Sequence, residues 1–519
     1  MPDPSEPTSL ADIARRRVRR DPSASFLLTI EDEAPFVVHP HSYGRVVARA
    51  CLLADALAAT GLVPGEHVGC YLPNSPSWVV TSLGVWWRGG VVAAVGTLVP
   101  PDEAARLFAM AGVSTVVTIT GVPAPPGDFA VVRVDDDGLL DGHPDPGEVG
   151  WDRDDLILPA GDDRALAIFT SGTTGRPKGV THTHADVVAS ARRVAAGYAR
   201  TSDYRPDPAP SHLAPGVVFN PFGHMAGYNR LGFRMWIGRP TVIVPKFTVA
   251  SVRALLACFD MDALQLTPTM IHMLATTDVE LDLSGVKYAT SGTAPLSVAT
   301  RESFETRYGV PVMQAYGMSE VGAVAQERYG DVVAGRRGPG SVGRIAAGVE
   351  VRIRHLDDDR PPGEGEILVR TDEASSEFIG GEPVPLDADG WFATGDVGRI
   401  DDEILYITGR VQEKIIVGGF NVYPAEVEDV ARRSALVRDA VVVALPDERL
   451  GEVPVAGVVW AADEDEDALL EELRADLPHY KVPRALFPLD AVPLTARGKV
   501  DRRRALELAQ GALGNTRQR

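Results

Sequence analysis

The stretch TSGTTGRPKG, Thr170 to Gly179, places three glycines, three threonines, a serine and one lysine in ten residues. Glycines let backbone N–H groups approach an anion closely, hydroxyls add further donors, and the Lys178 ammonium supplies a positive charge. The spacing differs from the G-x-x-x-x-G-K-[ST] loop, because Pro177 precedes the lysine and Gly179 follows it. The stretch therefore predicts a phosphate-binding loop of another design, with a nucleoside triphosphate as its ligand.

The residues on either side of this loop indicate how it is built into a fold. The apolar run Ala165 to Phe169 precedes it, and apolar residues between Val187 and Tyr198 follow at helical spacing. We therefore expect the loop to join a strand to a helix, which disfavours the alternative of a flexible surface turn. Similar alternation earlier in the chain predicts an α/β layered sheet. Its expected elements are a helix at Tyr43–Ala59, a strand at His67–Leu72, a helix at Ser77–Trp87 and a strand at Thr115–Ile119.

Later segments change in character. From Gly343 to Ile407, short runs alternate between apolar and polar residues and are separated by Gly, Pro and Asp, which predicts a small antiparallel β unit. The last hundred residues predict a separate α+β domain, with strands at Ala440–Leu445 and Val455–Trp460 and a helix carrying Leu469 to Leu477. The glycines at 338, 340 and 343 satisfy G-x-G-x-x-G, but a strand-like segment follows them, which disfavours a dinucleotide site.

Composition excludes several classes of protein. The chain has 519 residues, and its net charge of −20 disfavours binding to nucleic acid or to anionic membranes. The most apolar window, Trp78 to Val99, contains Arg88 and several glycines, so it does not predict a membrane span. No secretory signal is visible at the N-terminus. Three cysteines without a C-x-x-C pair fit a reducing compartment, and we expect a cytoplasmic protein.

Five further segments of the sequence add to the prediction of a nucleotide-binding protein. They are SGTAP (Ser291–Pro295), QAYGMSE (Gln314–Glu320), GWFATGD (Gly390–Asp396), YITGRVQEKIIVGGFNVYP (Tyr406–Pro424) and PLTARGKV (Pro493–Val500). Together with the glycine loop they resemble, in order, the signature motifs of the adenylate-forming superfamily. That superfamily includes acyl-CoA synthetases, the adenylation domains of peptide synthetases and firefly-type luciferases. The resemblance runs from about Ser42 to Ala505, nearly the whole chain.

The resemblance implies a fold of the α/β class. A large multi-layered N-terminal domain, residues 1–408, would contain two α/β sheets and a small β-barrel. A hinge at 409–414 would lead to a smaller, mobile α+β C-terminal domain at 415–519, which carries Lys499. Rotation of that domain between two configurations would serve two half-reactions.

The implied activity is ligation of a carboxylic acid to coenzyme A through an acyl-AMP intermediate, with ATP and Mg²⁺. Because two anions must meet, the site needs cations and aimed donors. By resemblance, Lys499 contacts the α-phosphate, Glu320 binds Mg²⁺, Tyr316 stacks on adenine, and Asp396 and Arg410 contact the ribose. The full set of expected nucleotide-binding residues is Thr170, Ser171, Gly172, Thr173, Thr174, Gly175, Lys178, Gly292, Thr293, Ala294, Tyr316, Gly317, Ser319, Asp396 and Arg410.

The resemblance also places the acid and coenzyme A. His224 either gates the pantetheine path or packs on the acid, and the alternative is a structural core histidine. An acyl pocket is expected from Phe219, Phe222, Gly223, His224, Gly227 and Met318. These residues suggest an apolar acyl or aryl group, and the lack of an aspartate between 217 and 227 disfavours an α-amino acid. Coenzyme A would be bordered by Gly418, Gly419, Lys481 and Arg484.

The chain departs from the family pattern at the hinge. Gln412 and Glu413 stand where a lysine followed by an acidic residue is common. Catalysis of only one half-reaction therefore stays open, as does transfer to a separate carrier protein. A protein that binds nucleotide without catalysis is disfavoured because Lys178 and Lys499 are both present. The pair His182 and His184 resembles a metal motif, but no third ligand lies near it in sequence.

Overall fold

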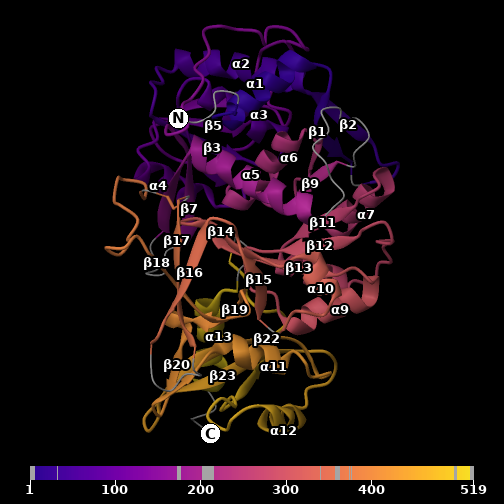
Figure 1. The fold of residues 1–519 in the computed structure, drawn as a ribbon, viewed down its shortest axis with the longest axis vertical. Helices are drawn as coiled ribbons and strands as arrows, with labels where there is room; N and C mark the ends of the chain where they lie inside the picture. The colour runs from indigo at the N-terminus through magenta and orange to yellow at the C-terminus, as the bar shows by residue number, and fades with distance from the viewer. Residues whose placement is uncertain are drawn as a thin grey trace. The chain divides into compact units, whose positions relative to one another are not determined.

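The computed structural model of the chain describes residues 6–31, 33–171, 177–201, 215–338, 340–356, 363–372, 374–375, 377–495 and 500–514 (Figure 1). It divides into two compact units. The first comprises Met1–Thr293, Gly317–Ala323 and Asp372–Pro385, and the second comprises Ala294–Tyr316, Val324–Thr371 and Leu386–Arg519. Each unit has its own hydrophobic cores.

A six-stranded sheet, in the order β6-β5-β3-β4-β7-β8, forms the centre of the first unit. Its strands are β3 (His67–Leu72), β4 (Val91–Gly96), β5 (Thr115–Ile119), β6 (Ala130–Val134), β7 (Arg164–Ser171) and β8 (Pro177–Thr183). Neighbouring strands run parallel except for β7 and β8, which are antiparallel. The runs of β3 and β4 are apolar on both faces because parallel sheets are covered on both sides.

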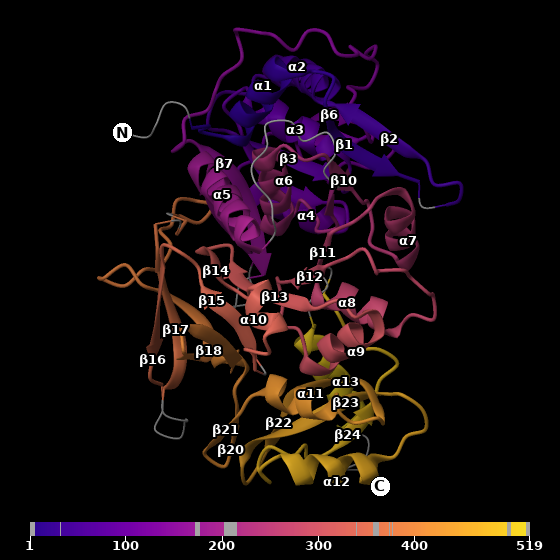
Figure 2. The ribbon, with the colours of Figure 1, turned by 45° about the vertical axis from the view of Figure 1, so that its right-hand side comes forward.

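Helices of the first unit pack on this sheet and on each other (Figure 2). They are α1 (Leu10–Arg20), α2 (Tyr43–Ala59), α3 (Pro76–Trp86), α4 (Pro101–Met110), α5 (His184–Thr201), α6 (Met225–Ile237), α7 (Val249–Cys258) and α8 (Pro268–Thr276). Helix α3 is buried all round, and the Trp78 indole donates to the Tyr228 hydroxyl of α6 at 2.7 Å. The predicted helices at 43–59 and 77–87 are confirmed to within one residue.

The glycine loop corrects one prediction. The loop was expected to join a strand to a helix, but it joins β7 to β8, and α5 begins only after β8. Residues 177–183 form a strand because Thr181 and His182 are buried against neighbours and proline is tolerated at the first residue of an edge strand. The glycine loop therefore connects two antiparallel strands.

The first unit also contains a four-stranded sheet and a parallel pair. The four-stranded sheet has the order β2-β1-β10-β9, from β1 (Ser25–Ile30), β2 (Val38–Ser42), β9 (Gly216–Val218) and β10 (Thr241–Ile243). The parallel pair is β11 (Ala263–Leu266) and β12 (Tyr288–Ser291). Helix α6 packs against β9, and β9 lies next to β11.

The predicted antiparallel β unit is confirmed in the second unit. Its strands follow the path β14-β15-β19-β18-β17-β16. The elements of this region are α9 (Val298–Tyr308), β13 (Val312–Met318), β14 (Gly322–Gln326), α10 (Tyr329–Val333), β15 (Ser341–Ile345), β16 (Val349–Arg354), β17 (Glu364–Thr371), β18 (Phe392–Asp401) and β19 (Ile404–Arg410). Gly343 has φ of +88°, and a Cβ there would lie 2.1 Å from the Gln326 carbonyl carbon. The G-x-G-x-x-G glycine at 343 thus serves close strand packing, and a strand follows it as expected.

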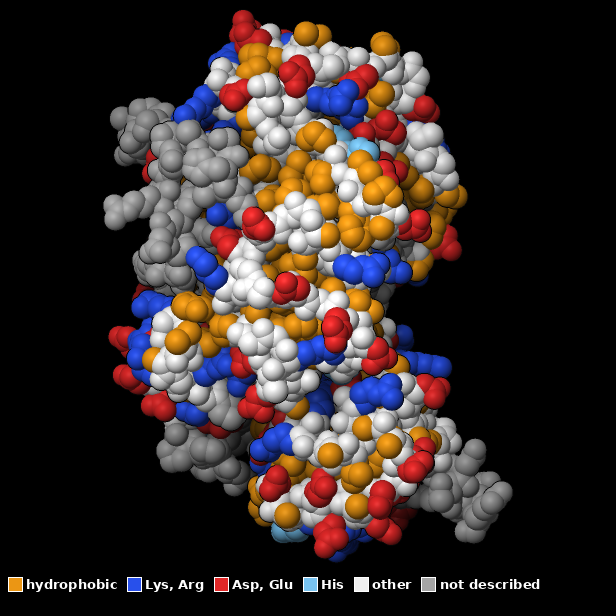
Figure 3. Space-filling view, turned by 90° about the vertical axis from the view of Figure 1, so that its right-hand side faces the viewer, with side chains coloured by type: hydrophobic (Ala, Val, Ile, Leu, Met, Phe, Trp, Pro, Cys, Tyr) orange, Lys and Arg blue, Asp and Glu red, His pale blue; other side chains and the backbone are white. Residues whose placement is uncertain are grey.

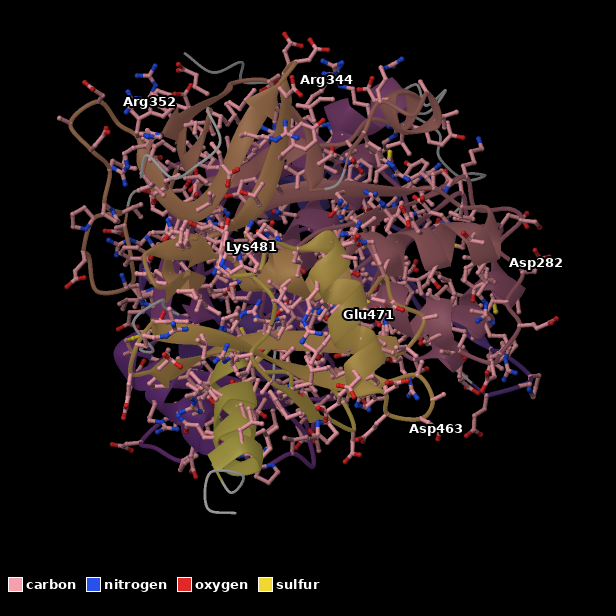
Figure 4. The ribbon with its side chains drawn as sticks, turned by 90° about the horizontal axis from the view of Figure 1, so that it is seen from below. Asp282, Arg344, Arg352, Asp463, Glu471 and Lys481 are labelled. Carbon is pink, nitrogen blue, oxygen red and sulfur yellow. The ribbon has the colours of Figure 1, made fainter. Side chains whose placement is uncertain are left out.

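The rest of the second unit is the predicted α+β region. Strands β21-β20-β23-β22 form a sheet, and β24 pairs with β23. The elements are the short 3₁₀ helix η1 (Val411–Glu413), β20 (Ile415–Val417), β21 (Phe420–Val422), α11 (Pro424–Ala431), β22 (Val437–Asp447), β23 (Gly451–Trp460), α12 (Glu466–Asp476), β24 (Leu486–Pro488) and α13 (Arg502–Gly514). Helix α12 buries Leu469 and Leu473, whereas Glu471, labelled in Figure 4, is exposed.

The surface carries both signs of charge. Basic and acidic side chains are interspersed over the face shown in Figure 3, so the net charge of −20 is not gathered into one field on that face.

None of the helices among the described residues has the length and apolar character needed to cross a bilayer. Cys51 and Cys70 are buried and Cys258 is half-buried, and all three are free thiols.

Candidate active site

The predicted phosphate loop connects strand β7 to strand β8. Thr170 lies opposite Lys178, and Ser171 lies opposite Pro177. Lys178 is exposed, and its Nζ lies 5.1 Å from the centre of the Phe378 ring, within the range of a cation–π contact. The loop positions Gly172, Thr173, Thr174 and Gly175 lie outside the described residues, so their predicted phosphate contacts stay predictions.

The outer edge of β8 is covered by a segment from much later in the chain. The Ile379 amide donates to the Gly179 carbonyl at 2.7 Å, and the Thr181 amide donates to the Glu377 carbonyl at 3.1 Å. Pairing of this kind satisfies the open hydrogen-bonding groups of an edge strand. A Cβ at position 179 would lie 2.0 Å from Ile379 Cδ1, so close packing requires the glycine after Lys178. The strand that carries the lysine is thereby fixed on both sides.

The same segment links β8 to Glu320. His182 Nδ1 and Ser375 Oγ lie 3.2 Å apart, and both side chains are buried. The Ser375 amide donates to the Glu320 carbonyl oxygen at 2.8 Å. Burial lowers the pKa of His182 to about 4, so its imidazole is neutral at physiological pH. Sequence reasoning missed Ser375, because 193 residues separate it from His182 and no local pattern joins them.

The two histidines of β8 and α5 are structural. His184 is the first residue of α5, and its ring packs edge-on against Trp86 with centroids 5.4 Å apart. Burial lowers the pKa of His184 to about 3. Within the described part of the chain, no cluster of three His, Cys, Asp or Glu side chains could hold a metal ion.

Glu320 offers a donor suited to Mg²⁺. It is half-buried, and its main chain is fixed by Ser375. Gly317 allows the turn before it, because a Cβ there would lie 2.4 Å from the Gly322 carbonyl oxygen. Mg²⁺ is usually held by one or two carboxylates together with phosphate oxygens and water. A single carboxylate therefore fits an ion that arrives with a triphosphate, and does not build a cage of its own.

Three of the predicted nucleotide residues meet in the second unit. The Tyr316 hydroxyl donates to Asp396 Oδ2 at 2.6 Å, and Arg410 Nε donates to Asp396 Oδ1 at 2.8 Å. Asp396 and Arg410 are direct partners across β18 and β19. The Asp396 amide donates to Thr394 Oγ1 at 3.0 Å, which fixes the main chain.

The Asp396 carboxylate affects the pKa values of both its partners. Burial raises the pKa of Tyr316, and the neighbouring Asp396 charge raises it further. Burial alone would lower the pKa of Arg410, but the charges of Asp396 and Glu413 together outweigh burial, and the pKa is raised. Asp396 is only 5% exposed and shares its oxygens with both partners. The remaining lone pairs can accept hydrogen bonds from vicinal hydroxyls.

The motif after β12 contains an unusual backbone position. Thr293 has φ of +74°, a conformation that costs a non-glycine residue free energy and often marks a functional turn. Gly292 precedes it, and Ser291 ends β12 with its hydroxyl buried. Ser319, before Glu320, is also buried. The predicted contacts of Gly292, Thr293, Ala294, Gly317 and Ser319 with a nucleotide stay predictions.

The predicted acyl-pocket residues divide by their contacts. Phe222 is fully buried, and its ring stacks on Trp78 with centroids 5.8 Å apart, so it belongs to the core of the first unit. A Cβ at Gly227 would lie 2.8 Å from the Pro221 carbonyl oxygen, so this glycine lets α6 begin. His224 caps α6, because its Nδ1 accepts from the Ala226 amide at 3.1 Å.

The other predicted pocket residues differ in their burial. Phe219 packs edge-on against Phe247 with centroids 5.1 Å apart, and it is buried. Gly223 and Met318 are half-buried. Their roles toward an acid, and that of His224, stay predictions.

The hinge and the expected coenzyme A residues lie in the second unit. Gln412 is exposed, whereas the Glu413 carboxylate accepts from Arg502 Nε at 3.1 Å. Gly418 and Gly419 form the β20–β21 turn with φ of +57° and +93°. These values explain why glycine occupies both positions.

The two basic residues expected at coenzyme A differ in their contacts. Lys481, labelled in Figure 4, donates to both Glu426 carboxylate oxygens at 2.6 and 2.7 Å. Arg484 is exposed. Because Lys481 is already paired, Arg484 is the better placed of the two for a phosphate. Lys499 lies outside the described residues.

Comparison with known proteins adds to this geometry. A family model described as AMP-binding enzyme matches residues 15–377, and one described as AMP-binding enzyme C-terminal domain matches residues 426–499. The chain is 30% identical over 479 residues to the long-chain-fatty-acid–CoA ligase FadD13 of Mycobacterium tuberculosis (strain CDC 1551 / Oshkosh), which covers 88% of this chain and 91% of that protein. It is 32% identical over 488 residues to a 7a-methyl-1,5-dioxo-octahydro-indenyl-propanoyl:CoA ligase of M. tuberculosis (strain ATCC 25618 / H37Rv), with 88% and 91% covered. The crystal structure of ATP-bound MatB from Rhodopseudomonas palustris superposes with a TM-score of 0.81 at 25% identity, covering 96% of this chain and 99% of that one.

Proposed function

This chain belongs to the AMP-binding enzyme family, and on that premise we propose that it is an ATP-dependent acid–CoA ligase acting through an acyl-adenylate. The relatives at 30% and 32% identity are both named as CoA ligases of carboxylic acids. The proposal keeps the predicted division into residues 1–408, a hinge at 409–414 and a C-terminal domain at 415–519.

The observation that carries the proposal is the contact of Tyr316 and Arg410 with Asp396. A buried carboxylate held by a phenol and a guanidinium has little freedom to move, so its free lone pairs point in fixed directions. Two ribose hydroxyls can donate to such a carboxylate without further ordering of the protein. Tyr316 would present its ring to adenine while its hydroxyl stays on Asp396.

The triphosphate would be bound by other residues of the predicted set. Lys178 and the backbone amides of the glycine loop would neutralise the β- and γ-phosphates, and Glu320 would hold Mg²⁺ with phosphate oxygens and water. When bound, Mg²⁺ supplies positive charge that offsets the triphosphate. Ser375 supports this end, because it fixes the Glu320 main chain to the strand that carries Lys178.

The proposed reaction has two steps. An oxygen of the substrate carboxylate attacks the α-phosphorus of ATP, a new P–O bond forms, and the bond to the bridging oxygen of pyrophosphate breaks. Lys499 would stabilise the negative charge that develops on the α-phosphate oxygens. The sulfur of coenzyme A then attacks the acyl carbon, the C–O bond to AMP breaks, and the thiol proton leaves to solvent. Gly418 and Gly419 would border the pantetheine arm and Arg484 the nucleotide phosphate of coenzyme A.

Two narrower functions remain as alternatives. The altered hinge at Gln412 and Glu413 favours, as a second candidate, a protein that completes only one half-reaction. Transfer of the acyl group to a separate carrier protein is the other. The expected acid is largely apolar and lacks an α-amino group, because no carboxylate lies between residues 217 and 227 to pair with an amine.

Measuring the two half-reactions separately tests the proposal. Acid-dependent release of pyrophosphate reports the first, and thioester formation from a synthetic acyl-AMP reports the second. We expect both activities with coenzyme A, and Lys499→Ala should impair the first far more than the second. ATP binding without pyrophosphate or AMP from any of a panel of aryl, fatty and polycyclic acids would refute the proposed function. Activity in the second assay alone would establish the half-reaction alternative.

A further inference from the structure

Arg230 has an unusual environment for a cation. It lies on α6, is half-buried, and burial lowers the pKa of its guanidinium to about 10. Among the described residues, no carboxylate forms an ion pair or hydrogen bond with it, and the titratable group that acts on its charge is the Tyr288 phenol. A neutral phenol cannot offset the lost hydration of a guanidinium as a carboxylate does.

Two other arginines of low exposure have carboxylate partners. Arg49 is 5% exposed, and its Nη2 lies 2.8 Å from Asp145 Oδ2. Arg432 Nε lies 2.7 Å from Asp439 Oδ1. Arg301, 5% exposed, also loses hydration, but the carboxylates of Glu327, Glu305 and Glu302 act on its charge. Among the described residues, no carboxylate acts in this way on Arg230.

Two buried polar atoms without partners among the described residues lie on β12, the strand of Tyr288, and on the neighbouring β11. Tyr288 and Thr290 lie two residues apart on β12 and share a face, and Gln265 of β11 is the direct neighbour of Thr290. Gln265 and Thr290 are 4% and 5% exposed. In the described structure, neither Gln265 Oε1 nor Thr290 Oγ1 has a hydrogen-bond partner. Buried polar atoms are rarely left unpaired, so these atoms point to a ligand or to water.

Helix α6 adds a further unpaired atom. Asn229, which precedes Arg230, has a buried Oδ1 that makes no hydrogen bond within the described residues. The packing of α6 on β9, and of β9 beside β11, brings these elements into one region of the first unit. Within the described part of the chain, the region therefore combines a cation that has no carboxylate partner with several hydrogen-bonding atoms that have no partner.

The position on α6 relates this region to the predicted acyl pocket. Gly227 and Arg230 are three residues apart and so lie on the same side of the helix. Arg230 follows the His224 cap by six residues, which is about 9 Å along the axis at 1.5 Å per residue. A substrate that enters beside His224 would reach Arg230 with the end opposite its reacting carboxyl.

We propose that Arg230 determines specificity by receiving a second, negatively charged oxygen group, a carboxylate or sulfonate, at the far end of the acid substrate. This inference rests on the proposed function and sharpens it. The aromatic residues expected in the pocket would contact the apolar middle of the acid, while Arg230 would contact its distal anion. Gln265, Thr290 and Asn229 would complete the hydrogen bonds of that anion, directly or through water.

Matched acids test the assignment. The pairs are adipate with hexanoate and suberate with octanoate, and monomethyl adipate supplies a neutral oxygen at the same position. For the wild type we expect a higher kcat/KM in pyrophosphate release for the diacid of each pair. Arg230→Met should lower the diacid preference by roughly 30- to 100-fold, since it removes a charge-assisted pair. Arg230→Lys should restore part of the preference because it keeps the charge.

Two controls make the result decisive. Arg192→Met removes an exposed arginine of α5 that pairs with Glu6, and it should leave the preference unchanged. Direct calorimetric titration of adipate and hexanoate needs no catalysis, so it tests Arg230 even if the ligase function fails. Stronger adipate binding that is lost in Arg230→Met supports the inference. Equal preference in the wild type and Arg230→Met, or a preference for the monoacids and for monomethyl adipate in both, would overturn it.

Discussion

Arg502, the first residue of α13, and Arg230, near the middle of α6, are both half-buried arginines, yet their surroundings differ. Arg502 is hydrogen-bonded to the buried Glu428 and to Glu413, and their charges raise its pKa although burial would lower it. Arg230 lacks such partners in the described structure, and burial lowers its pKa. Arg502 therefore stabilises the fold through its ion pairs, whereas Arg230 is the charge that we assign to a ligand.

The predicted nucleotide-binding residues Tyr316, Asp396 and Arg410, here called the nucleotide cluster, combine a structural role with a predicted binding role. Asp396 is paired with Arg410 and Tyr316, so it contributes to the fold of the β unit, but carboxylate lone pairs remain for a ligand. A site can therefore combine structure and binding in one group. The comparison predicts that stability and activity respond differently at each of the three positions.

The largest expected effect on stability is at Arg502. Arg502→Met leaves Glu428, which is 4% exposed, with Arg432 as its remaining arginine partner. Breaking a buried pair by removing one partner typically costs about 3 kcal/mol or more. We expect the free energy of unfolding from urea denaturation to fall by about that amount. Glu413→Gln serves as the control, and a loss as large as that of Arg502→Met would show that Glu428 is not the important partner.

A similar loss is expected on acidification, through His182. The unfolded chain protonates this histidine near pH 6.5, whereas the folded chain does so only near pH 4. Stability is therefore lost as the pH falls through this window, by about 3 kcal/mol for this one group. His182→Gln keeps a hydrogen-bonding group for Ser375 and should flatten the dependence of unfolding free energy on pH. Identical slopes for the two proteins between pH 6.5 and 4 would contradict the assignment.

At the nucleotide cluster we expect a loss of activity. Asp396→Asn removes the ion pair with Arg410 and weakens acceptance of the ribose hydroxyls, so the KM for ATP should rise by about 10- to 100-fold. Tyr316→Phe removes one hydrogen bond and keeps the ring, so a rise of about 10-fold or less is expected. Steady-state kinetics with saturating acid measure both. A larger effect for Tyr316→Phe than for Asp396→Asn would assign the hydroxyl, not the carboxylate, to the nucleotide.

The smallest effect on stability is expected at Arg230. Arg230→Met removes a charge that lost hydration without gaining an anion, so the unfolding free energy should stay within about 1 kcal/mol of the wild type or rise. Urea denaturation without substrate checks this. A loss comparable to that of Arg502→Met would mean that Arg230 has a structural partner after all, which would remove the contrast.

Helices and strands with a regular spacing of apolar residues were predicted well from the sequence. The helix at Tyr43–Ala59 and the strand at Thr115–Ile119 match the structure because apolar spacing is a local property. The segment after the glycine loop was misassigned, because the helical pattern from residue 187 concealed a short edge strand that pairs with β7 and with residues 377–379.

Candidate site residues within motifs could also be named from sequence, but their contacts could not. The pairing of Asp396 with Arg410 depends on strand register, and the link from His182 to Ser375 spans 193 residues. Arg230 carries no motif at all. Its significance lies in the absence of a carboxylate among its described neighbours, which a sequence does not reveal.

Acid-dependent exchange of labelled pyrophosphate into ATP tests the central claim most directly, because exchange requires reversible formation of an acyl-adenylate. We predict exchange that depends on the acid and on Mg²⁺ and that falls strongly in Asp396→Asn at limiting ATP. Exchange that is absent with every acid, or that proceeds equally without any acid, would contradict the account.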